Sequence, residues 1–368
     1  MSAVQESPAT EAMLALLRPD LRGFAGYASA RRDTAQGSVW LNANESPWPS
    51  GADPGLGLNR YPEPQPAGLR AALAKLYAVD AGQVLVTRGS DEGIDLLVRA
   101  FCRPGRDAVA IAPPCFGMYA VCARVQAAPL VEVPLIDDGQ GWTLDEAALL
   151  AATRSRGARL VFLCSPANPT GQALSMEAIS RLAAELAGQA VLVLDEAYGE
   201  YSREPSAATL LDAHANLVVL RTLSKAHALA GARIGTLLAD AALVALLRNL
   251  APPYPVPLPC ALLAQAALQD DALAQSRQRC AQVIEQRALL AERLRSLPGV
   301  RRVYPSQGNF LLLRLDDAQG VLERLLQAGI VVRDMRAHAG LGDALRISLG
   351  TPADNAAVLA ALAPAVAA

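Results

Sequence analysis

Five polar side chains in the middle of the chain have the chemistry to act together on one small molecule. They are Asn168 in the run SPANPTG, Asp195 and Tyr198 at and after the end of the apolar run VLVL, and Lys225 and Arg233 further on. A lysine amine bonds an aldehyde, an aspartate keeps a pyridine nitrogen protonated, and a phenol with an amide holds a ring oxygen. An arginine with nearby hydroxyls holds a phosphate. Together these residues predict a binding site for pyridoxal 5′-phosphate.

Each of these residues also has an ordinary structural interpretation. A lysine after a serine is usually an exposed side chain, and an aspartate that ends an apolar run often caps a helix. The run at residues 165–171 is rich in proline and also contains asparagine and glycine, which are typical of turns. The complete set in this order favours the cofactor site, because several motifs together match by chance far less often than one motif alone.

The composition is that of a large globular protein without a nucleic-acid or membrane partner. The chain has 368 residues, of which 52% are hydrophobic and 18% charged, which is enough for two domains. A net charge of −2 gives no long-range attraction to nucleic acid or to anionic lipid. Residues 1–6 lack the basic start and apolar run of a signal peptide, and no apolar stretch is long enough to span a bilayer.

The cysteines and histidines indicate a reduced, cytoplasmic protein without a metal site. None of the six cysteines forms a CxxC pair, and most lie in apolar surroundings. The three histidines, His214, His227 and His338, do not have the spacing of metal ligands. We therefore assign no metal.

The middle of the chain alternates short apolar runs with helical patterns, which indicates strands buried on both faces of a mostly parallel sheet. Residues 261–297 are predicted to form one long amphipathic helix after a proline-rich hinge. We expect a segment at 1–50 that has little helix or strand pattern and packs on the small domain or a partner subunit, a large domain at 51–255 and a smaller α+β domain at 256–368. The expected strands are residues 83–87, 107–111, 159–164, 190–194, 217–220 and 234–238, and then 309–315, 330–333 and 346–350.

The run GSDEG at residues 89–93 comes directly after the first expected strand, and apolar residues then recur at helical spacing. Ser90 and Asp91 therefore lie at a strand-to-helix turn, where the first backbone N–H groups of the helix are free. Such a turn is a natural anion site. It predicts a cradle for the cofactor phosphate.

These residues resemble the fold-type I pyridoxal-phosphate-dependent aminotransferases, and further motifs resemble the histidinol-phosphate aminotransferase family among them. The similarity extends from about Tyr27 to the end of the chain. It implies an α/β fold, with a large domain on a mostly parallel central sheet flanked by helices and a smaller α+β domain. The motifs are LNANE (41–45), NRYPE (59–63), RGSDEGIDLL (88–97), PPCFGMY (113–119), LRTLSKAHALAGAR (220–233) and LRISLGT (345–351).

The resemblance implies a role for each residue that would contact the cofactor ring. Lys225 would bond the cofactor covalently and move the proton. Asp195 would pair with the pyridinium nitrogen, and Tyr198 with Asn168 would hold the ring oxygen. Phe116, where many relatives have tyrosine, would stack on the ring.

The resemblance also implies which residues hold the anionic groups. The cofactor phosphate would be bound by the backbone at Ser90 and Asp91 and by Thr222, Ser224 and Arg233. Tyr61 would reach that phosphate from the partner subunit of a homodimer. The substrate carboxylate or phosphate would be held by Arg346 with Asn44, and Arg333 and Tyr27 are further candidates. A planar arginine fork suits both anions.

The implied reaction transfers an amino group from glutamate to imidazole-acetol phosphate, giving 2-oxoglutarate and histidinol phosphate, in histidine biosynthesis. An aromatic or broad-range aminotransferase would use the same residues around the cofactor. A phosphothreonine decarboxylase would release carbon dioxide instead. A non-catalytic regulator on this fold is disfavoured, because Lys225 is retained and only a short segment precedes Tyr27. His227 stands where relatives commonly have phenylalanine, and the sequence leaves open whether it packs or lies near the cofactor.

Overall fold

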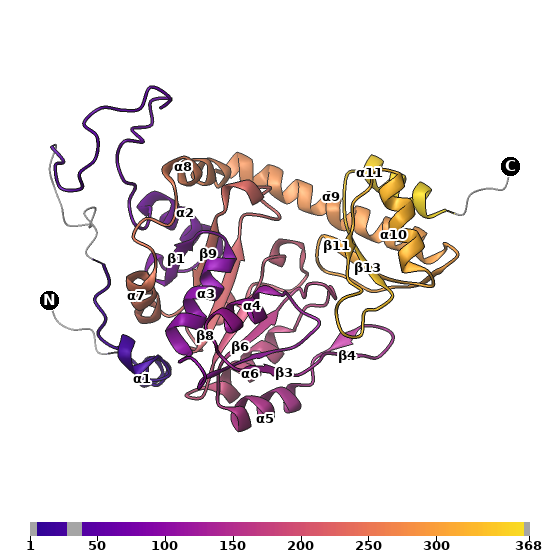
Figure 1. Cartoon of the computed structure of the whole chain (residues 1–368), viewed down its shortest axis with the longest axis horizontal. Coiled ribbons are helices and arrows are strands. Elements are labelled where there is room, and N and C mark those ends of the chain that lie inside the picture. Colours follow the sequence, from indigo (N-terminus) through magenta and orange to yellow (C-terminus); the bar gives the residue numbers. More distant parts are fainter. Residues whose placement is uncertain (1–5, 28–38, 364–368) are drawn as a thin grey trace.

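The protein has two domains joined by one long helix. The computed structural model describes residues 6–27 and 39–363. A large domain is built on a seven-stranded sheet and a small domain on a four-stranded sheet. Helix α9 (Asp270–Arg295) runs from the large domain along the small one, as Figure 1 shows.

The central sheet is parallel except for one strand. Strand β9 pairs antiparallel with both of its neighbours, and every other pairing in the sheet is parallel. Its central strands are apolar and almost wholly buried, as expected for a sheet covered on both faces. In spatial order the strands are β1 (Val84–Thr87), β9 (Gly235–Leu238), β8 (Leu217–Thr222), β7 (Val191–Asp195), β6 (Ala158–Cys164), β2 (Ala108–Ile111) and β3 (Leu130–Glu132).

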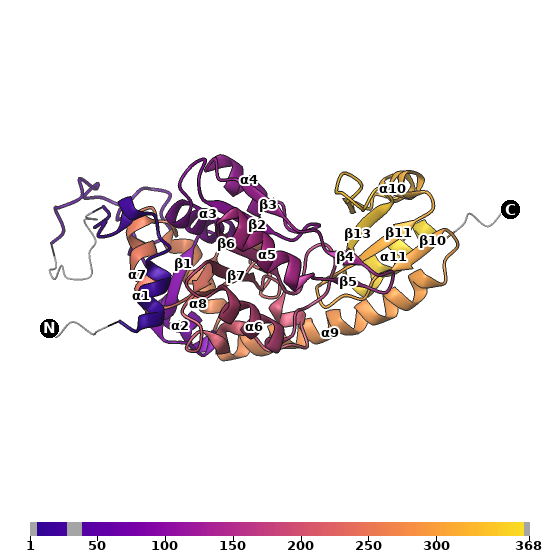
Figure 2. The same ribbon diagram turned by 90° about the horizontal axis from the view of Figure 1, so that it is seen from below.

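Alternate side chains of each strand enter two separate cores. Leu192 and Leu194 of β7 lie in one core, and Val191 and Val193 lie in the other. Figure 2 shows α3 and α4 on one side of the sheet and α6 and α8 on the other. The helices of the first core are α2 (Ala67–Tyr77), α5 (Glu146–Arg156), α6 (Met176–Leu186) and α8 (Leu258–Ala267), and those of the second are α3 (Ser90–Phe101), α4 (Met118–Val125) and α7 (Ala241–Leu250).

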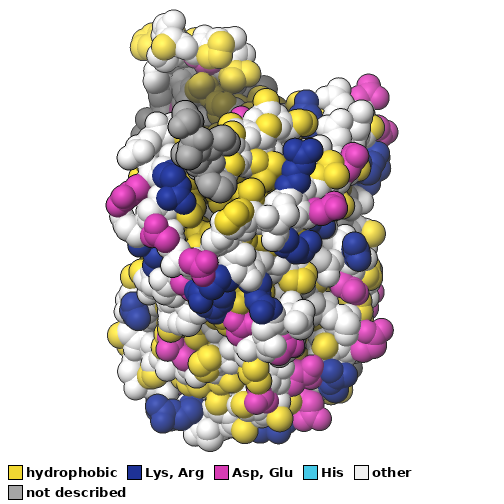
Figure 3. All heavy atoms as spheres, turned by 90° about the vertical axis from the view of Figure 1, so that its right-hand side faces the viewer, with side chains coloured by type: hydrophobic (Ala, Val, Ile, Leu, Met, Phe, Trp, Pro, Cys, Tyr) yellow, Lys and Arg dark blue, Asp and Glu magenta, His cyan; other side chains and the backbone are white. Residues whose placement is uncertain are grey.

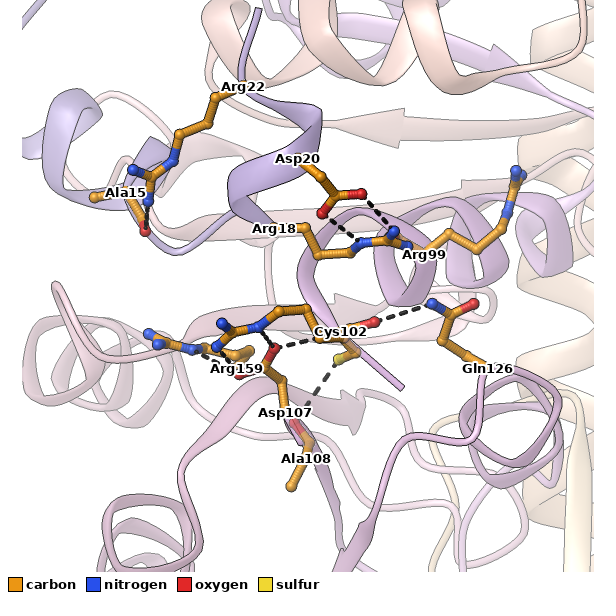
Figure 4. Close-up of polar contacts among 11 residues, drawn as sticks. Ala15, Arg18, Asp20, Arg22, Arg99, Cys102, Asp107, Ala108, Gln126 and Arg159 are labelled. Carbon is orange, nitrogen blue, oxygen red and sulfur yellow. Dashed lines mark hydrogen bonds and ion pairs between the residues drawn. The ribbon is translucent and has the colours of Figure 1, made fainter. Parts of the chain in front are cut away.

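We expected the N-terminal segment to pack on the small domain or on a partner subunit, but residues 6–27 of this segment pack on the large domain of their own chain. Its helix α1 (Pro8–Leu14), which the sequence pattern did not predict, buries Met13 in the second core. Thr10 Oγ1 donates to Asp240 at 2.8 Å, and an Arg18 nitrogen donates to the carbonyl of Arg99 at 3.1 Å. Figure 4 shows Arg18 paired with Asp20 beside this region. Residues 8–18 are therefore fixed by the domain that holds the central sheet.

The core of the large domain continues past residue 255, where we expected it to end. Ala261 and Ala264 of α8 are buried in it, so α8 belongs to the large domain. The predicted single helix at 261–297 is two helices, and Asp270 and Asp271 lie in the first turn of the second one. Acidic residues favour a helix N-terminus, which explains the new start at that point.

The small domain has a core of its own between its sheet and its helices. Its apolar cluster includes Leu294 of α9, Leu313 and Ile347. The expected strand at 330–333 is largely wrong, because only its last residue joins a short edge strand that starts at Arg333. The elements after α9 are β10 (Val300–Val303), β11 (Phe310–Leu315), α10 (Ala318–Gln327), β12 (Arg333–Asp334), β13 (Ala344–Ser348) and α11 (Pro352–Leu362).

A hairpin of the large domain clasps the small domain. Its strands are β4 (Ile136–Asp137) and β5 (Trp142–Thr143). The carboxylate of Asp137 accepts hydrogen bonds from the Tyr304 hydroxyl at 2.5 Å and from Arg314 at 2.9 Å. Although burial opposes it, these two donors hold the pKa of Asp137 below its usual value. Trp142 packs in one apolar cluster with Tyr304. The clasp fixes where the small domain stands over the sheet.

The surface has the mixed charge that the composition predicts. Figure 3 views the small-domain end, where basic and acidic side chains are interspersed over the face. Among residues 6–27 and 39–363, no helix is both long and apolar enough to cross a membrane.

Gly235 on β9 lies unusually close to the backbone of the turn that precedes α3. A Cβ atom at this position would lie 2.2 Å from the backbone carbon of Gly89. Real Cβ atoms do not approach backbone so closely, so a larger residue must push the turn before α3 away. Gly231, four residues earlier, has no heavy atom within 4 Å of an added Cβ.

We predict that Gly235→Ala lowers the free energy of unfolding by about 1–3 kcal/mol or more, because the strain falls on backbone that cannot rotate away. Gly231→Ala, the matched control, should change it by less than about 0.5 kcal/mol. Urea unfolding of both variants measures the difference. Equal stability of the two variants would contradict the close approach at Gly235.

Candidate active site

A cavity lies where the carboxyl ends of β6, β7 and β8 meet the start of α3. Its volume is about 140 Å³. The carboxyl ends of neighbouring parallel strands share one edge of the sheet, so residues distant in sequence meet there. Ten residues predicted from the sequence line it: Ser90, Asp91, Phe116, Asn168, Asp195, Tyr198, Thr222, Ser224, Lys225 and Arg233.

One end of the cavity is built to receive an anion. Helix α3 begins at Ser90 after Gly89, whose φ of 77° favours glycine. The first N–H groups of this helix are therefore available at the cavity. Arg233 lies beside them and pairs with the Asp91 carboxylate at 3.2 Å. The hydroxyls of Thr222 and Ser224 lie 2.9 Å apart on the same side.

A buried carboxylate lies at the other end. Asp195 ends β7 and is 2% exposed. One of its oxygens accepts from the Tyr119 hydroxyl at 2.7 Å, and the other accepts from the Ala197 N–H at 3.1 Å. Burial raises the pKa of Asp195 to about 6, although both hydrogen bonds act in the opposite direction. The two hydrogen bonds thus hold the carboxylate in a fixed orientation, although burial removes the water that would stabilise its charge.

Lys225 projects into the cavity between these two ends. Its amine lies 5.8 Å from the centre of the Tyr198 ring. Partial burial lowers the pKa of Lys225, and the positive charges of Arg346 and Arg233 lower it further. A larger fraction of this amine is therefore neutral and nucleophilic than in an ordinary exposed lysine.

The small domain contributes Arg346 to the same place. Arg346 lies on β13 and donates to the side-chain oxygen of Asn168, so it bridges the two domains. Its guanidinium carbon stands 5.3 Å from the centre of the Phe310 ring. Its Nε is buried without a hydrogen-bond partner, and burial lowers the pKa of the group. An anionic ligand would satisfy this nitrogen.

Comparison with known proteins identifies the family. Residues 33–362 match the aminotransferase class I and II family. The chain belongs to this family. It is 59% identical over 350 residues to a histidinol-phosphate aminotransferase of Stenotrophomonas maltophilia, covering 95% of this chain and 96% of the relative. It is 58% identical, with the same coverage, to a histidinol-phosphate aminotransferase of Xanthomonas axonopodis pv. citri.

Solved structures of an aminotransferase and of a decarboxylase share the fold. One is the histidinol-phosphate aminotransferase of Sinorhizobium meliloti in complex with pyridoxal-5′-phosphate, with a TM-score of 0.73, 27% identity and 82% of each chain covered. Another is the L-threonine-O-3-phosphate decarboxylase of Porphyromonas gingivalis, with a TM-score of 0.71, 27% identity and coverage of 83% of this chain and 90% of that one. The predicted fold-type I architecture of this aminotransferase is confirmed.

Four predicted residues, Tyr27, Asn44, Tyr61 and Arg333, do not line the cavity of their own chain. Asn44 and Tyr27 are exposed. Tyr61 is half exposed and stacks on Tyr254, with ring centres 4.6 Å apart. Arg333 is paired with Arg346 across β12 and β13, but its own side chain is exposed. Their predicted roles therefore depend on a partner subunit or on the bound substrate.

His227 lies behind the cavity rather than in it. Its side chain is 4% exposed, and its Nε2 is 3.5 Å from Glu200. Glu200 and Glu196 both pair with the buried Arg221, at 2.5 Å and 2.6 Å. Although burial opposes it, the charge of Arg221 lowers the pKa of Glu200 to about 2. The histidine of this aminotransferase packs against an ion network beneath Lys225.

Two residues of the site were missed by the sequence reasoning. Cys164, at the end of β6, lines the cavity. Tyr119 holds Asp195, as described above. Tyr119 follows Phe116 by three residues in the motif PPCFGMY, a separation that is typical of side chains on the same side of a helical turn. The contact with Asp195 has no such signal, because 76 residues separate the two.

We predict that Asp195→Asn stabilises the cofactor-free protein at pH 7.5. With a folded pKa of about 6 against the usual 3.8, this carboxyl favours the fold below pH 3.8 and disfavours it as the pH rises through 6. The difference corresponds to roughly 3 kcal/mol, and an asparagine oxygen can still accept from Tyr119.

Thermal unfolding of the cofactor-free wild type and variant, at pH 7.5 and at pH 4, checks this prediction. At pH 7.5 the variant should have a higher melting temperature than the wild type. At pH 4 most of this difference in melting temperature should disappear. A variant that is less stable at pH 7.5 would show that the site stabilises the ionised carboxylate.

Proposed function

We propose that this protein transfers an amino group from glutamate to imidazole-acetol phosphate, giving 2-oxoglutarate and histidinol phosphate, in histidine biosynthesis. The observation that carries the proposal is the 59% identity over 95% of the chain to an enzyme of that name. The cavity adds the groups that the reaction requires, namely a lysine of lowered pKa and an arginine with an unpartnered nitrogen.

The residues of the cavity fit pyridoxal 5′-phosphate. Asp195 is a buried carboxylate, and among the described residues no cation lies within ion-pair distance of it. A pyridinium nitrogen would supply the missing positive charge. Ser90, Thr222, Ser224 and Arg233 would hold the phosphate, and Asn168 with Tyr198 the ring oxygen. When bound, the cofactor stabilises the negative charge that develops on the substrate carbon.

The chain itself supplies binding and proton transfer. The Lys225 amine would hold the cofactor and would serve as the acid and base that moves the proton during the transfer. Partial burial lowers the pKa of Lys225, which favours the neutral amine that accepts a proton. Asp195 would direct its charge toward the pyridine nitrogen, and Phe116, in the segment just before α4, would cover the face of the ring.

Arg346 is proposed to bind the anionic end of both substrates. The carboxylate of glutamate and the phosphate of histidinol phosphate offer the same pair of oxygens to a planar guanidinium. The clasp between Asp137, Tyr304 and Arg314 holds the sheet that carries Arg346 over the cavity. This arrangement explains how one site could accept two different acids.

A decarboxylase is the second candidate. The structure of a phosphothreonine decarboxylase is as similar to this chain as that of an aminotransferase. The two reactions share the cofactor and differ in which bond of the substrate breaks. The product therefore decides between them.

The cofactor-loaded enzyme should be supplied separately with histidinol phosphate, phenylalanine and phosphothreonine, each in a single turnover followed by the visible absorbance of the cofactor. We expect histidinol phosphate to react with the highest kcat/KM and 2-oxoglutarate to accept the amino group. Preference for phenylalanine would indicate an aromatic aminotransferase, and release of carbon dioxide from phosphothreonine would indicate the decarboxylase.

Arg346→Gln should lower kcat/KM for glutamate and for histidinol phosphate by about 10- to 150-fold, the loss expected for a hydrogen bond to a charged group. Arg324→Gln, an exposed arginine on α10 of the same domain, is the matched control and should change neither. Loss for only one substrate would show that the two anions bind at different places.

The protein is further proposed to be a cytoplasmic homodimer. All six cysteines are free, which suits a reducing compartment. The loop that carries Tyr61 is held by Glu45, which accepts from the Tyr61 N–H at 2.6 Å and from Arg60 at 2.9 Å. With its ring half exposed, Tyr61 could reach the phosphate site of a second copy.

Mixing two impaired variants tests the shared site. In a Lys225→Ala and Tyr61→Ala heterodimer, one site combines the native Lys225 of one subunit with the native Tyr61 of the other. Activity should therefore return in part when subunits exchange. If mass spectrometry shows exchange and no activity returns, Tyr61 does not serve the partner's site.

A further inference from the structure

Tyr119 is the side chain that grips Asp195 from behind the cavity. Its hydroxyl lies 2.7 Å from the Asp195 carboxylate, and both side chains are buried, at 0% and 2% exposure. Tyr119 is absent from the wall of the cavity itself. Its effect on a bound molecule must therefore be indirect, and its hydroxyl reaches the cavity wall through the hydrogen bond to Asp195.

The phenol ring of Tyr119 is fixed by its packing. It stacks on Phe162 of β6, with ring centres 5.0 Å apart and planes 13° apart. Phe116 meets it edge to face at 5.7 Å and 84°. Both are favourable aromatic geometries. Because neighbours hold two sides of the ring, the hydroxyl cannot easily turn away from Asp195.

The hydrogen bond runs from Tyr119 to Asp195. Burial, together with the nearby charge of Asp195, raises the pKa of the Tyr119 phenol well above its usual value. The phenol therefore stays protonated and is the donor of the hydrogen bond to Asp195. The Ala197 N–H donates to the other carboxylate oxygen. Two donors thus orient the carboxylate in one plane.

Most of the other influences on Asp195 oppose its ionisation. Burial is the largest, and the negative charges of Asp91 and Glu196 act in the same direction. The amine of Lys225 favours the charged form from across the cavity. The remaining titratable groups nearby are Cys164 and Tyr198, both of which keep their protons because their pKa values are raised.

We propose that Tyr119 is a positioning residue that keeps Asp195 ionised and aimed at the pyridine nitrogen of the cofactor. The inference rests on the proposed binding of pyridoxal 5′-phosphate. Tyr119 touches neither cofactor nor substrate. Its contribution is to hold the charge and direction of the group that does.

The test is the pH dependence of cofactor affinity in the cofactor-free enzyme, measured by equilibrium dialysis with pyridoxal 5′-phosphate. In the wild type the affinity should fall as the pH drops through about 6, where Asp195 takes up a proton. Tyr119→Phe removes a hydrogen bond that stabilises the ionised carboxylate. The pH at which half of the cofactor affinity is lost should therefore rise by about one to two pH units. Tyr77→Phe removes a buried phenol that makes no contact with Asp195, and it should leave the fall where it was.

A second ligand separates charge from packing. In an analogue whose ring nitrogen is replaced by carbon, ionised Asp195 has no positive partner, so the loss of affinity at low pH should be absent in wild type and variant alike. A uniform loss of affinity for pyridoxal 5′-phosphate at every pH, without movement of the fall, would mean that Tyr119 only fills space and would overturn the proposal.

If Tyr119→Phe does not fold, a variant that strengthens the hydrogen bond to Asp195 provides the test instead. Difluorotyrosine placed at position 119 is a stronger donor of nearly the same shape, so the fall should move to lower pH. No movement in that protein would also refute the role of Tyr119. If the wild type itself does not bind pyridoxal 5′-phosphate, the proposed function fails instead.

Discussion

A carboxylate that is buried before any ligand arrives is the constraint on which this site depends. Asp195 lies at the carboxyl end of a central strand, where almost no water reaches it. Its charge is tolerated because Tyr119 and the Ala197 N–H donate to it and because the cavity beside it can admit a cation. The fold accepts this loss of solvation at one point and in return presents a fixed negative charge to a ring nitrogen.

Several of the other charged groups around the cavity are already paired with one another. Beneath Lys225, the buried Arg221 neutralises Glu196 and Glu200, so two further carboxylates near the site are already paired. His227 closes this network from the loop that follows Lys225. On the opposite side, the clasp at Asp137 fixes the small domain, and with it the cation of Arg346. The charges of the site therefore form two parts. Cations that can bind anions lie at the rim, and the Asp195 carboxylate has no ion-pair partner among the described residues.

The sequence by itself determined the mostly parallel sheet of the large domain and most of its strand ends, and together with the family resemblance it named ten residues of the cavity. These depend on local patterns: runs of apolar residues mark doubly buried strands, and polar residues at the ends of parallel strands must converge on one edge. Lys225, Asp195, Tyr198 and Asn168 were placed in this way, and the structure brings all four together. A helix start after Gly89 likewise follows from residue type alone.

Only the tertiary structure decided which side chains outside the cavity wall support the residues that line it. The contact of Tyr119 with Asp195, the ion network around Arg221 and the clasp at Asp137 join residues that are distant in the chain, and no periodic pattern records such pairs. The packing of α1 on the large domain and the division of the long helix at Asp270 were missed for a related reason. Amphipathic patterns tell which face of a helix is buried, but the partner it is buried against is set by the assembled fold.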